Sequence, residues 1–460
     1  MDIKEIKSVY FVGAGGIGMS AIVRYFLSKG IFVGGYDRTP SDLTERLVAE
    51  GADIHYVEDV ELIPEICRNK ATTLVVYTPA IPQEHAELCW FREQGFEVQK
   101  RAQVLGTITR SGCALCVAGT HGKTTTSTMV AHLLHQSQVG CNAFLGGISK
   151  NYGTNYILSE KSEFVVIEAD EFDRSFHHLT PYASVITSAD PDHLDIYGTK
   201  EAYLESFRHY TSLIREGGAL VIHEGLEVEP NVAEGVKIYT YSRHNGDFHA
   251  KNIRIGGGEI VFDYVSPLGS IDDICLGVPV SINIDNGIAA MALAQIAGVS
   301  DAEIKAGMAS FKGVGRRFDF KIKTENKVFL SDYAHHPSEI RQCALSLREL
   351  YADRRITALF QPHLYSRTRD FYREFAESLS LFDNVILVEI YPAREEPIPG
   401  VTSALIADCL SSETGCIQCR KEDILTVIGE QAQDLEVLVS LGAGDIENYA
   451  ENIASLLLEK

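Results

Sequence analysis

The segment with the clearest chemical meaning is Gly-Thr-His-Gly-Lys-Thr-Thr, which follows the apolar run ALCVAG. In such a loop between a strand and a helix, backbone amides hold phosphate oxygens, a lysine reaches the β and γ phosphates, and a hydroxyl binds Mg²⁺. The generic pattern has a glycine where this chain has Val117, so the loop is short. The predicted nucleoside-triphosphate site comprises Gly119, Thr120, His121, Gly122, Lys123, Thr124 and Thr125.

Acidic residues follow the next two apolar runs, FVVIE and SVITSAD. They are Glu168, Asp170 and Glu171 in one group, and Asp190 and Asp192 with His193 in the other. Because ligands bind at the carboxyl ends of parallel strands, we expect these side chains to face the phosphate loop and to hold Mg²⁺. Capping of the following helices is the alternative for the acids, and histidine is an unusual ligand for Mg²⁺.

A second glycine-rich loop follows the apolar run SVYFV near the start of the chain. It reads Gly-Ala-Gly-Gly-Ile-Gly over residues 13–18, a pattern that lets backbone amides approach a pyrophosphate where a helix begins. Asp37 ends the next predicted strand, where an acid that binds a ribose or uridine would lie. The pattern predicts a site for a nucleotide diphosphate of unspecified base, and a turn without a ligand is the alternative.

A third group of candidates lies in SDYAHHP and FQPHLYSRTRDF. Asp332 is suited to orient a histidine or a phosphate-bound water, and His335 is followed by a second histidine and a proline, an odd sequence for a core. Arg367 and Arg369 follow another apolar run, where a planar guanidinium would clamp a carboxylate or phosphate. The arginines at 316–317 would reach a phosphate or be solvated. A structural role is the alternative for each of these residues.

Parallel strands are needed to bring such residues together, and three blocks of the chain have that character. In each block apolar runs of strand length alternate with helical patterns, which predicts α/β domains with doubly wound parallel sheets. Residues 225–280 are turn-rich and predict a β-rich insertion in the second block. Softer stretches at 101–112 and 311–321 carry glycines suited to hinges. The predicted domains are 1–109, 110–316 and 317–460.

Composition narrows the class of protein. At roughly 150 residues per domain, 460 residues indicate about three domains, and 45% hydrophobic with 23% charged residues is typical of globular proteins. The net charge of −22 disfavours nucleic acid and anionic membranes as partners. We see no basic leader and no apolar run of about 18 residues, and the ten cysteines are scattered. These features favour the cytoplasm and no membrane insertion.

The motifs taken together resemble the Mur ligase family. They are, in chain order, GTHGKTTT, IEADEFDRSF, DPDHLDIY, GVGRRFDF, DYAHHP, FQPHLYSRTRDF, YPAREEPIPG and GAGDI. With GAGGIGMS and YTPAI, they are most similar to the members that join L-alanine to UDP-N-acetylmuramate. The resemblance implies a Rossmann-like N-terminal domain for the UDP-linked substrate, a central phosphate-loop ATPase domain and a Rossmann-like C-terminal domain for the amino acid. It also implies an acyl-phosphate route that releases ADP and phosphate during peptidoglycan precursor synthesis.

The resemblance further implies residue roles. Residues expected to act in the chemistry are Lys123, His193, Asp332, His335 and Arg367. Residues expected to bind ATP, beyond the phosphate loop, are Asn283, Asn286 and Arg317. The expected Mg²⁺ ligands are Thr124, Glu168 and His193. Residues expected to face the UDP part are Gly13, Ala14, Gly15, Gly16, Gly18, Asp37 and Thr78.

The sequence departs from the family pattern in three ways. Ile282 stands where a histidine usually precedes the first asparagine, and Leu364 stands where many relatives have arginine. No lysine matches the carbamylated lysine of several sister ligases. Three rival functions stay open: a nicotinamide-dependent oxidoreductase, a nucleotide-switched binding module, and a ligase that attaches a whole tripeptide to the same sugar acid. The oxidoreductase reading leaves the phosphate loop unexplained.

Overall fold

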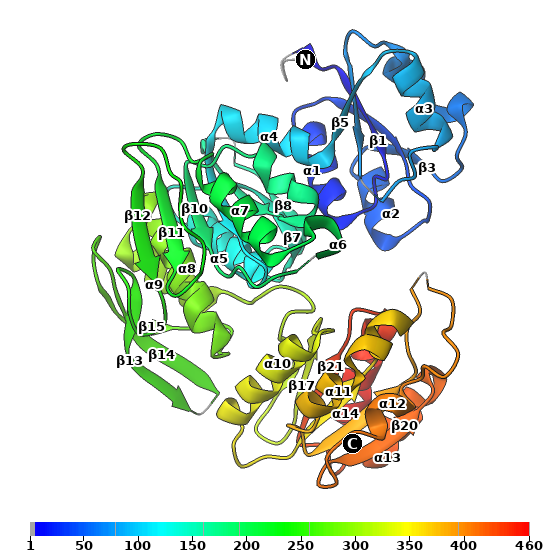
Figure 1. Cartoon of the computed structure of the whole chain (residues 1–460), viewed down its shortest axis with the longest axis vertical. Helices are drawn as coiled ribbons and strands as arrows, with labels where there is room; N and C mark the ends of the chain where they lie inside the picture. The colour runs from blue at the N-terminus through cyan, green and yellow to red at the C-terminus, as the bar shows by residue number, and fades with distance from the viewer. Residues whose placement is uncertain are drawn as a thin grey trace. The chain divides into compact units, whose positions relative to one another are not determined.

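A computed structural model describes residues 5–78, 80–159, 161–192, 194–256, 258–393 and 395–459, without the side chains of Ser111, Leu194 and Asp195. The chain divides into two compact units. Unit 1 comprises residues 1–251, 263–272 and 286–310, and unit 2 comprises residues 252–262, 273–285 and 311–460. Both units are α/β, as the alternation of apolar runs and helical patterns predicts (Figure 1).

The first sheet of unit 1 has five parallel strands in the order β3-β2-β1-β4-β5. The strands are β1 (Ser8–Val12), β2 (Phe32–Tyr36), β3 (Asp53–His55), β4 (Thr73–Tyr77) and β5 (Glu97–Lys100). The helices are α1 (Ile17–Ser28), α2 (Asp42–Ala49), α3 (Ala86–Glu93) and α4 (Arg101–Ser111). Every residue of β1 and β4 is buried, which explains their unbroken apolar runs.

The second sheet of unit 1 has the order β12-β11-β10-β6-β9-β7-β8, and it is parallel except for the β7–β8 pair. Its strands are β6 (Cys113–Ala118), β7 (Asn142–Ser149), β8 (Thr154–Ile157), β9 (Phe164–Ala169), β10 (Ala183–Ile186), β11 (Ala219–His223) and β12 (Lys237–Tyr241). Its helices are α5 (Lys123–His135), α6 (Leu194–Tyr197), α7 (Lys200–Thr211), α8 (Ile282–Ile296) and α9 (Asp301–Ser310), with the short 3₁₀ segment η4 (Phe172–His178).

One continuous hydrophobic core joins these two sheets. It contains Phe11 and Val33 of the first sheet, Cys116 and Ile167 of the second, and side chains of α4 between them. The stretch 101–112, which the sequence suggests as a flexible domain boundary, is mostly the helix α4, and its side chains belong to this core. A β-carbon added at Gly106 would lie 2.3 Å from the carbonyl oxygen of His178, so this glycine serves close packing against η4.

A small sheet has the order β13-β14-β15, from β13 (His249–Gly256), β14 (Glu259–Val265) and β15 (Ile271–Cys275). The predicted β-rich stretch thus forms strands.

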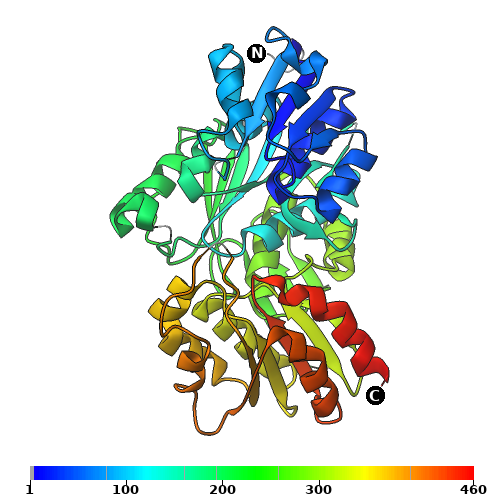
Figure 2. The same ribbon diagram turned by 90° about the vertical axis from the view of Figure 1, so that its right-hand side faces the viewer.

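Unit 2 contains a six-stranded sheet in the order β16-β17-β21-β18-β19-β20, parallel except for β16–β17. The strands are β16 (Asp319–Lys323), β17 (Val328–Asp332), β18 (Ile356–Phe360), β19 (Asn384–Val388), β20 (Gly415–Cys419) and β21 (Val437–Leu441). The helices are α10 (Pro337–Leu350), α11 (Tyr365–Leu379), α12 (Ala404–Ala407), α13 (Ile424–Gln431) and α14 (Ala450–Glu459). The α10–α11 and α13–α14 pairs cover opposite faces of the sheet (Figure 2).

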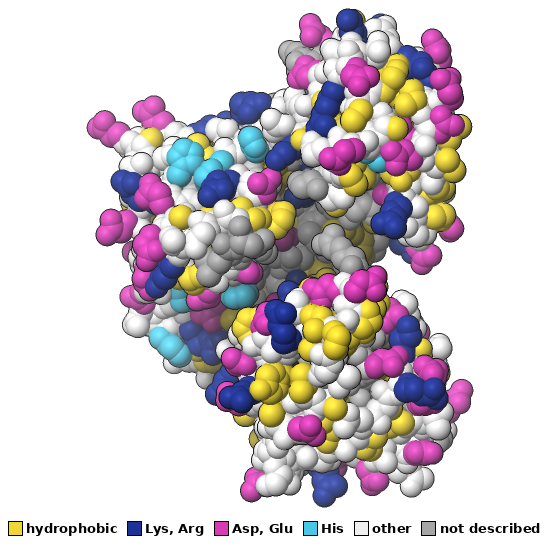
Figure 3. Space-filling view, turned by 45° about the vertical axis from the view of Figure 1, so that its right-hand side comes forward, with side chains coloured by type: hydrophobic (Ala, Val, Ile, Leu, Met, Phe, Trp, Pro, Cys, Tyr) yellow, Lys and Arg dark blue, Asp and Glu magenta, His cyan; other side chains and the backbone are white. Residues whose placement is uncertain are grey.

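The surface carries acidic and basic side chains intermixed rather than one broad basic face in the view of Figure 3. All ten cysteines are free thiols, including Cys416 and Cys419 of the C-x-x-C sequence. Among the described residues, no helix has both the length and the apolar character that a membrane crossing requires.

Candidate active site

The phosphate loop lies between β6 and α5, as predicted. Gly119 has φ +137° and Gly122 has φ +80°, a backbone region that favours glycine. A β-carbon at Gly119 would lie 2.1 Å from Oγ1 of Thr187, and one at Gly122 would lie 2.7 Å from Oδ1 of Asn286. The loop is thus compact because two of its positions have no room for a side chain, and its amides are held at the start of α5.

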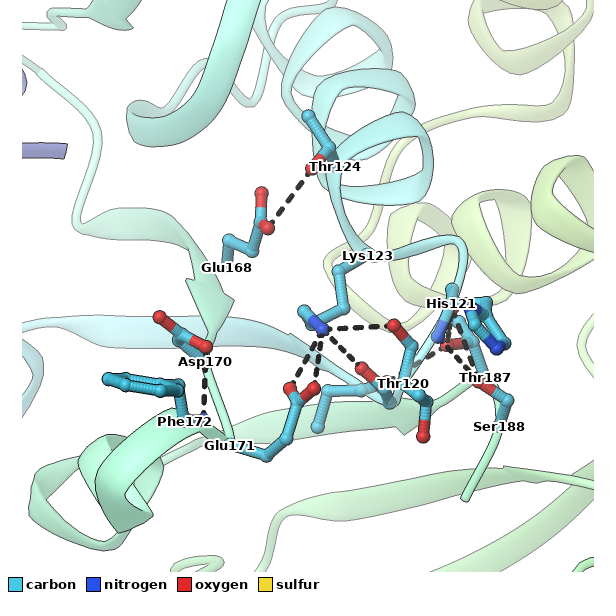
Figure 4. A network of polar contacts seen from close by, with 12 residues as sticks. Thr120, His121, Lys123, Thr124, Glu168, Asp170, Glu171, Phe172, Thr187 and Ser188 are labelled. Carbon is cyan, nitrogen blue, oxygen red and sulfur yellow. Dashed lines mark hydrogen bonds and ion pairs between the residues drawn. The ribbon is translucent and has the colours of Figure 1, made fainter. Parts of the chain in front are cut away.

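Lys123 is the first residue of α5, and its ammonium is enclosed by acceptors (Figure 4). It donates to the carbonyl oxygens of Gly119 at 2.6 Å and Thr120 at 3.2 Å. It also forms an ion pair with Glu171, with Nζ 2.7 Å from Oε2 and 3.0 Å from Oε1. The Glu171 side chain is 2% exposed, and its burial raises the pKa of the carboxyl group against the opposing effect of Lys123.

Thr124 and Glu168 form the second contact of the loop. Oγ1 of Thr124 donates to Oε1 of Glu168 at 3.0 Å, while the amide of Gly146 donates to Oε2 at 3.2 Å. A β-carbon at Gly146 would lie 2.2 Å from the same carboxylate, so glycine leaves the space that Glu168 occupies. A hydroxyl and a carboxylate held together are oxygen donors of the kind that suit Mg²⁺. The third predicted ligand, His193, lies outside the described residues.

The acidic residues at the ends of β9 and β10 differ in their contacts with the phosphate loop. Glu168 faces Thr124 and Glu171 faces Lys123, whereas Asp170 accepts from the amide of Phe172 at 3.1 Å (Figure 4). Asp190 contacts the loop from the other strand: its carbonyl oxygen accepts from the Thr120 hydroxyl at 2.7 Å, and its carboxylate lies 3.8 Å from Nε2 of His121. Thr125 follows in the first turn of α5.

The predicted adenine-site asparagines lie three residues apart on α8. Oδ1 of Asn286 accepts from the Thr126 hydroxyl at 3.2 Å, and it adjoins Gly122. Asn286 is therefore next to the phosphate loop. Nδ2 of Asn283 donates to the carbonyl oxygen of Val278 at 3.1 Å. Ile282, which replaces the usual histidine, is 45% exposed.

Asp37 stabilises the glycine-rich loop after β1 by a hydrogen bond. Oδ2 of Asp37 accepts from the amide of Gly15 at 2.6 Å, and Oδ1 accepts from the amide of Thr39 at 3.2 Å. Gly13 has φ +91°, and a β-carbon there would lie 2.7 Å from Cγ2 of Thr78. The predicted residues Gly13, Gly15, Asp37 and Thr78 are thus brought together, although Asp37 bonds the loop itself.

The start of α1 has the features of an anion site. Its first turn contains no acidic residue, and no side chain caps it at Gly16. The amide of Ala14 donates to the carbonyl oxygen of Tyr36 at 3.0 Å. The helix then begins after the N-cap Gly16, and Gly18 lies in its first turn. The first amides of a helix have no partner within it and attract negative charge.

The two adjacent arginines of unit 2, Arg316 and Arg317, make different hydrogen bonds. Nη2 of Arg316 donates to the carbonyl oxygens of Gly442 and Gly444, each at 3.2 Å, so Arg316 ties its loop to the residues after β21. The guanidinium groups of Arg316 and Arg317 both lie over the Tyr333 ring, at 4.7 and 5.0 Å from its centroid. Among the described residues the two backbone hydrogen bonds are made by Arg316 and not by Arg317, so Arg317 is the candidate for a ligand.

Asp332 ends β17 and organises the loop before it. Its carboxylate accepts from the amides of Phe318 and Ala334, each at 2.7 Å. Burial raises the pKa of Asp332, and the nearby Arg317 opposes that effect. Among the described residues the Asp332 carboxylate contacts backbone amides, so its orienting role stays a prediction, and another acid contacts a histidine.

That acid is Glu339 on α10. Its Oε2 accepts from the amides of His335 at 2.9 Å and His336 at 3.2 Å, and it lies 3.3 Å from Nδ1 of His335. Burial lowers the pKa of His335, and Arg367 and Arg317 lower it further, whereas Glu339 raises it. The His335 imidazole therefore lies near two cationic side chains that disfavour its charged form.

Arg367 lies on the first turns of α11, and its Nη1 is buried without a hydrogen-bond partner among the described residues. The ring of His363 stacks on Tyr391 at 5.6 Å and lies 6.3 Å from the His335 ring. Arg369 instead pairs with Asp370 at the surface. Leu364, before α11, has φ +72°, a strained value for a branched side chain.

Two contacts of these groups do not follow from the sequence patterns: that of Glu171 with Lys123 and that of Glu339 with His335. Glu171 was one of several acids after β9, and no spacing rule separates it from Glu168. Glu339 lies three residues after the helix N-cap His336, and this capping-box spacing is the signal in the sequence that marks it.

A parallel sheet with a Gly-Lys-Thr loop leading into a helix and carboxylates at the adjacent strand end defines a nucleotide-binding protein of the phosphate-loop class. Three family models match the chain in order: Mur ligase family, catalytic domain, over residues 8–112; Mur ligase middle domain, over 117–294; and Mur ligase, glutamate ligase domain, over 316–444.

Relatives extend this match along the whole chain. A protein of Phocaeicola vulgatus named UDP-N-acetylmuramate–L-alanine ligase is 70% identical over 460 residues, which cover 100% of both chains. A Porphyromonas gingivalis protein of the same name is 53% identical, over 96% of this chain and 97% of its own. The chain belongs to the Mur ligase family.

Solved structures agree with that assignment. The crystal structure of a UDP-N-acetylmuramate–alanine ligase from Thermotoga maritima has a TM-score of 0.81 at 26% identity, and it covers 98% of this chain and 99% of its own. A murein peptide ligase from Psychrobacter arcticus has a TM-score of 0.67 at 20% identity, with 98% of each chain covered, which is a likeness of fold. The predicted three-domain α/β fold is confirmed.

Proposed function

We propose that this chain is an ATP-dependent ligase that joins L-alanine to UDP-N-acetylmuramate in peptidoglycan precursor synthesis. Such an activity would serve cell wall biogenesis and, through it, cell shape and division. The observation that carries the proposal is the full-length match at 70% identity to a relative with that name. The two glycine-rich loops of unit 1 support it, because both substrates of the first step are nucleotides.

The first step is a phosphoryl transfer. A carboxylate oxygen of the sugar acid attacks the γ-phosphorus of ATP, the bond to the β–γ bridging oxygen breaks, and ADP leaves. Lys123 and the amides from Gly119 to Lys123 are positioned to neutralise phosphate charge, which is the main task of a protein in such a reaction. Nucleotide phosphates must take over the Lys123 ammonium from Glu171.

The second step forms the amide bond. The uncharged amine of L-alanine attacks the carbonyl carbon of the acyl phosphate, and inorganic phosphate leaves with the electron pair of the broken C–O bond. We assign His335 and Arg367 to the amino acid, and Arg317 and Asp332 to the completed ATP site. His335, whose pKa burial lowers, is suited to accept a proton, while Nη1 of Arg367, without a hydrogen-bond partner among the described residues, is suited to bind a carboxylate.

Thr124, Glu168 and His193 are the proposed Mg²⁺ ligands, and the ion would screen the phosphate charge. Oxygen donors of Thr124 and Glu168 that lie 3.0 Å apart suit this role. Asn283 and Asn286 are the proposed adenine contacts. The residues from Gly13 to Gly18, with Asp37 and Thr78, are proposed for the UDP part. The proposed domains remain 1–109, 110–316 and 317–460.

We also propose a cytoplasmic location, with no nucleic acid or membrane as partner. Ten free thiols accord with a reducing compartment, and a net charge of −22 disfavours polyanionic partners.

The decisive experiment supplies ATP, Mg²⁺, UDP-N-acetylmuramate and L-alanine and analyses every product. We expect UDP-N-acetylmuramoyl-L-alanine, ADP and phosphate in equal amounts. Release of AMP and pyrophosphate would exclude the acyl-phosphate route. ATP hydrolysis that does not depend on the sugar acid or alanine would indicate a nucleotide-switched binding module.

A second arm offers free L-alanine and the tripeptide L-alanyl-γ-D-glutamyl-diaminopimelate in competition. We expect alanine to be incorporated in large excess. Preferred incorporation of the tripeptide would assign the chain to the alternative activity that attaches a whole tripeptide. Consumption of NADH or NADPH in a control without ATP would support the oxidoreductase alternative.

A further inference from the structure

Four strands of the first sheet deliver a candidate side chain or loop at the same edge. The glycine-rich loop begins directly after β1, Asp37 directly after β2, Thr78 directly after β4, and Arg101 directly after β5. All of these strands are parallel, so their carboxyl ends lie at one edge of the sheet, where ligands bind in such folds. The first three belong to the proposed UDP site, and Arg101 has been assigned no role.

Arg101 lies against the glycine-rich loop. A β-carbon added at Gly18 would lie 2.4 Å from Nη1 and 3.2 Å from Cζ of Arg101. The guanidinium therefore occupies the space that a side chain at this position would take, within the first turn of α1. The absence of a side chain at Gly18 is what permits this cation to lie against the helix start.

The remaining contact of Arg101 is weak for a guanidinium. Nη2 lies 3.5 Å from Oδ2 of Asp170, and the two side chains are 25% and 38% exposed. The adjacent Lys100 has a closer ion pair, with Nζ 2.8 Å from Oδ2 of Asp173. Because a guanidinium has five N–H donors, one long contact among the described residues leaves most of the hydrogen-bonding capacity of Arg101 for a ligand.

We propose that Arg101 binds the diphosphate of the sugar nucleotide, together with the amides at the start of α1. This inference rests on the proposed function, since it refines where the UDP-linked substrate is held. A protein with a net charge of −22 needs a local cation where a diphosphate binds, and a planar guanidinium can donate two parallel hydrogen bonds to phosphate oxygens. Asp170 holds the guanidinium at the loop until the diphosphate arrives.

The test compares UDP with uridine, which differ by the diphosphate. Dissociation constants for both are measured by calorimetry, without metal or ATP, for the unaltered protein and for Arg101→Gln. We expect the dissociation constant of UDP to rise about 10-fold or more, as for the loss of charge-assisted hydrogen bonds. The constant for uridine should change less than about two-fold, since its contacts remain.

Three further variants separate a phosphate contact from a structural role. Lys100→Gln removes the neighbouring cation and should leave UDP affinity unchanged. Asp170→Asn breaks the same ion pair but keeps the cation, so UDP affinity should be retained or increased. Arg101→Lys should give an intermediate UDP affinity, because an ammonium keeps the charge without the planar fork. Thermal unfolding of each variant checks that the fold is intact.

Equal weakening of UDP and uridine by Arg101→Gln, or a matching loss in Asp170→Asn, would overturn the inference and make Arg101 a structural residue. Unchanged UDP affinity in Arg101→Gln would overturn it as well. If the unaltered protein bound neither UDP nor UDP-N-acetylmuramate, the proposed function would fail too, so the two failures are distinguishable.

Discussion

At the scale of single residues, the ligand-free phosphate loop is defined by the contact between Lys123 and Glu171. The ammonium lies 2.7 Å from a carboxylate that is 2% exposed. A buried charge without a partner is costly, so each member of this pair secures the other. The lysine that phosphate-loop chemistry requires is consequently held in place by an internal anion before any nucleotide binds.

Lys123→Ala should abolish ligation, with a loss of kcat on the order of 10³-fold or more, because a cation at the transferring phosphoryl group is removed. Product formation under saturating substrates is the measurement. Lys200→Ala is the matched control, since Lys200 pairs with Glu227 at the surface and should be neutral. Near-normal turnover of Lys123→Ala would remove the assignment of the phosphate loop.

Glu171→Gln should bind nucleotide more tightly. The substitution keeps the shape of the side chain but removes the anion that competes with phosphate for Lys123. We expect the dissociation constant of ADP, measured by calorimetry without metal, to fall by about three- to ten-fold. Asp173→Asn is the control, as it removes an acid of the same segment that contacts Lys100 instead. Weaker ADP binding by Glu171→Gln would mean that the carboxylate supports the nucleotide.

At the scale of elements, the N-terminal sheet buries a group that titrates near neutrality. Glu87 on α3 is fully buried, and it accepts from the Tyr10 hydroxyl at 2.6 Å and the amide of Asp59 at 3.1 Å. Burial raises the pKa of Glu87 to about 7, against the lowering effect of these hydrogen bonds. His55, which accepts or donates at 2.7 Å to the same hydroxyl, has a pKa that burial lowers.

The sign of the pH effect follows from linkage. Because the pKa of Glu87 is raised on folding from 4.5 to about 7, its contribution to stability is complete below pH 4.5 and is lost as pH rises through 7. His55 and His85 have lowered pKa values, so their contributions to stability are complete above pH 6.5 and are lost as pH falls below it. Because the histidines and Glu87 act in opposite directions, the contribution of Glu87 is measured as the difference in unfolding free energy between a Glu87 variant and the unaltered protein.

We expect Glu87→Gln to change the free energy of unfolding relative to the unaltered protein by about 1–3 kcal/mol more at pH 8 than at pH 5, in the stabilising direction. Urea unfolding across this range measures it. Glu93→Gln, an exposed position on the same helix, should show no such trend. A constant difference between Glu87→Gln and the unaltered protein would show that Glu87 does not titrate in the folded state at these pH values.

Sequence patterns predict the buried strands better than the edge strands. Buried parallel strands such as β1, β6, β9 and β10 are apolar runs, and the sequence predicts all four. The edge strands β5 and β20 read EVQK and GCIQC and are half-buried or exposed, so no apolar run marks them. Arg101 was missed for that reason: its meaning depends on the strand that ends immediately before it.

Contiguous motifs made the phosphate loop predictable down to the residue, because one stretch of chain supplies the glycines, Lys123 and Thr124. Contacts that join distant segments were not predictable in this way. The pairing of Lys123 with Glu171, the support of His335 by Glu339, and the different roles of Arg316 and Arg317 depend on side-chain directions that periodicity does not determine.

At the scale of the whole molecule, the chain is two units, each with its own buried core. Domains with separate cores generally unfold as units. We expect two calorimetric transitions, and UDP at about 100 times its dissociation constant should stabilise the transition of unit 1 by about 2.7 kcal/mol. The transition of unit 2 should not move, since the glycine-rich loop and Asp37 belong to unit 1.

Assignment of the two transitions uses a tryptophan. The single Trp90 lies on α3 in unit 1, so its fluorescence should follow the transition that UDP shifts. An equal shift of both transitions, or a fluorescence change that follows the unshifted one, would contradict this view of the stability of the chain.

The continuous core of the first two sheets has a consequence for the exchange of segments between relatives. Family models divide the chain near residue 112, yet the helix before that point contributes Val104, Leu105 and Ile108 to a core shared with Phe144 and Tyr156. In a chimera with a crossover near residue 112, the two halves of this core would come from different parents, and their side chains would not be matched in shape. A crossover at residue 311, where the chain enters unit 2 for its remaining length, keeps that core within one parent. Recombination libraries built from this family should therefore be richest in folded members when the first two sheets come from the same parent.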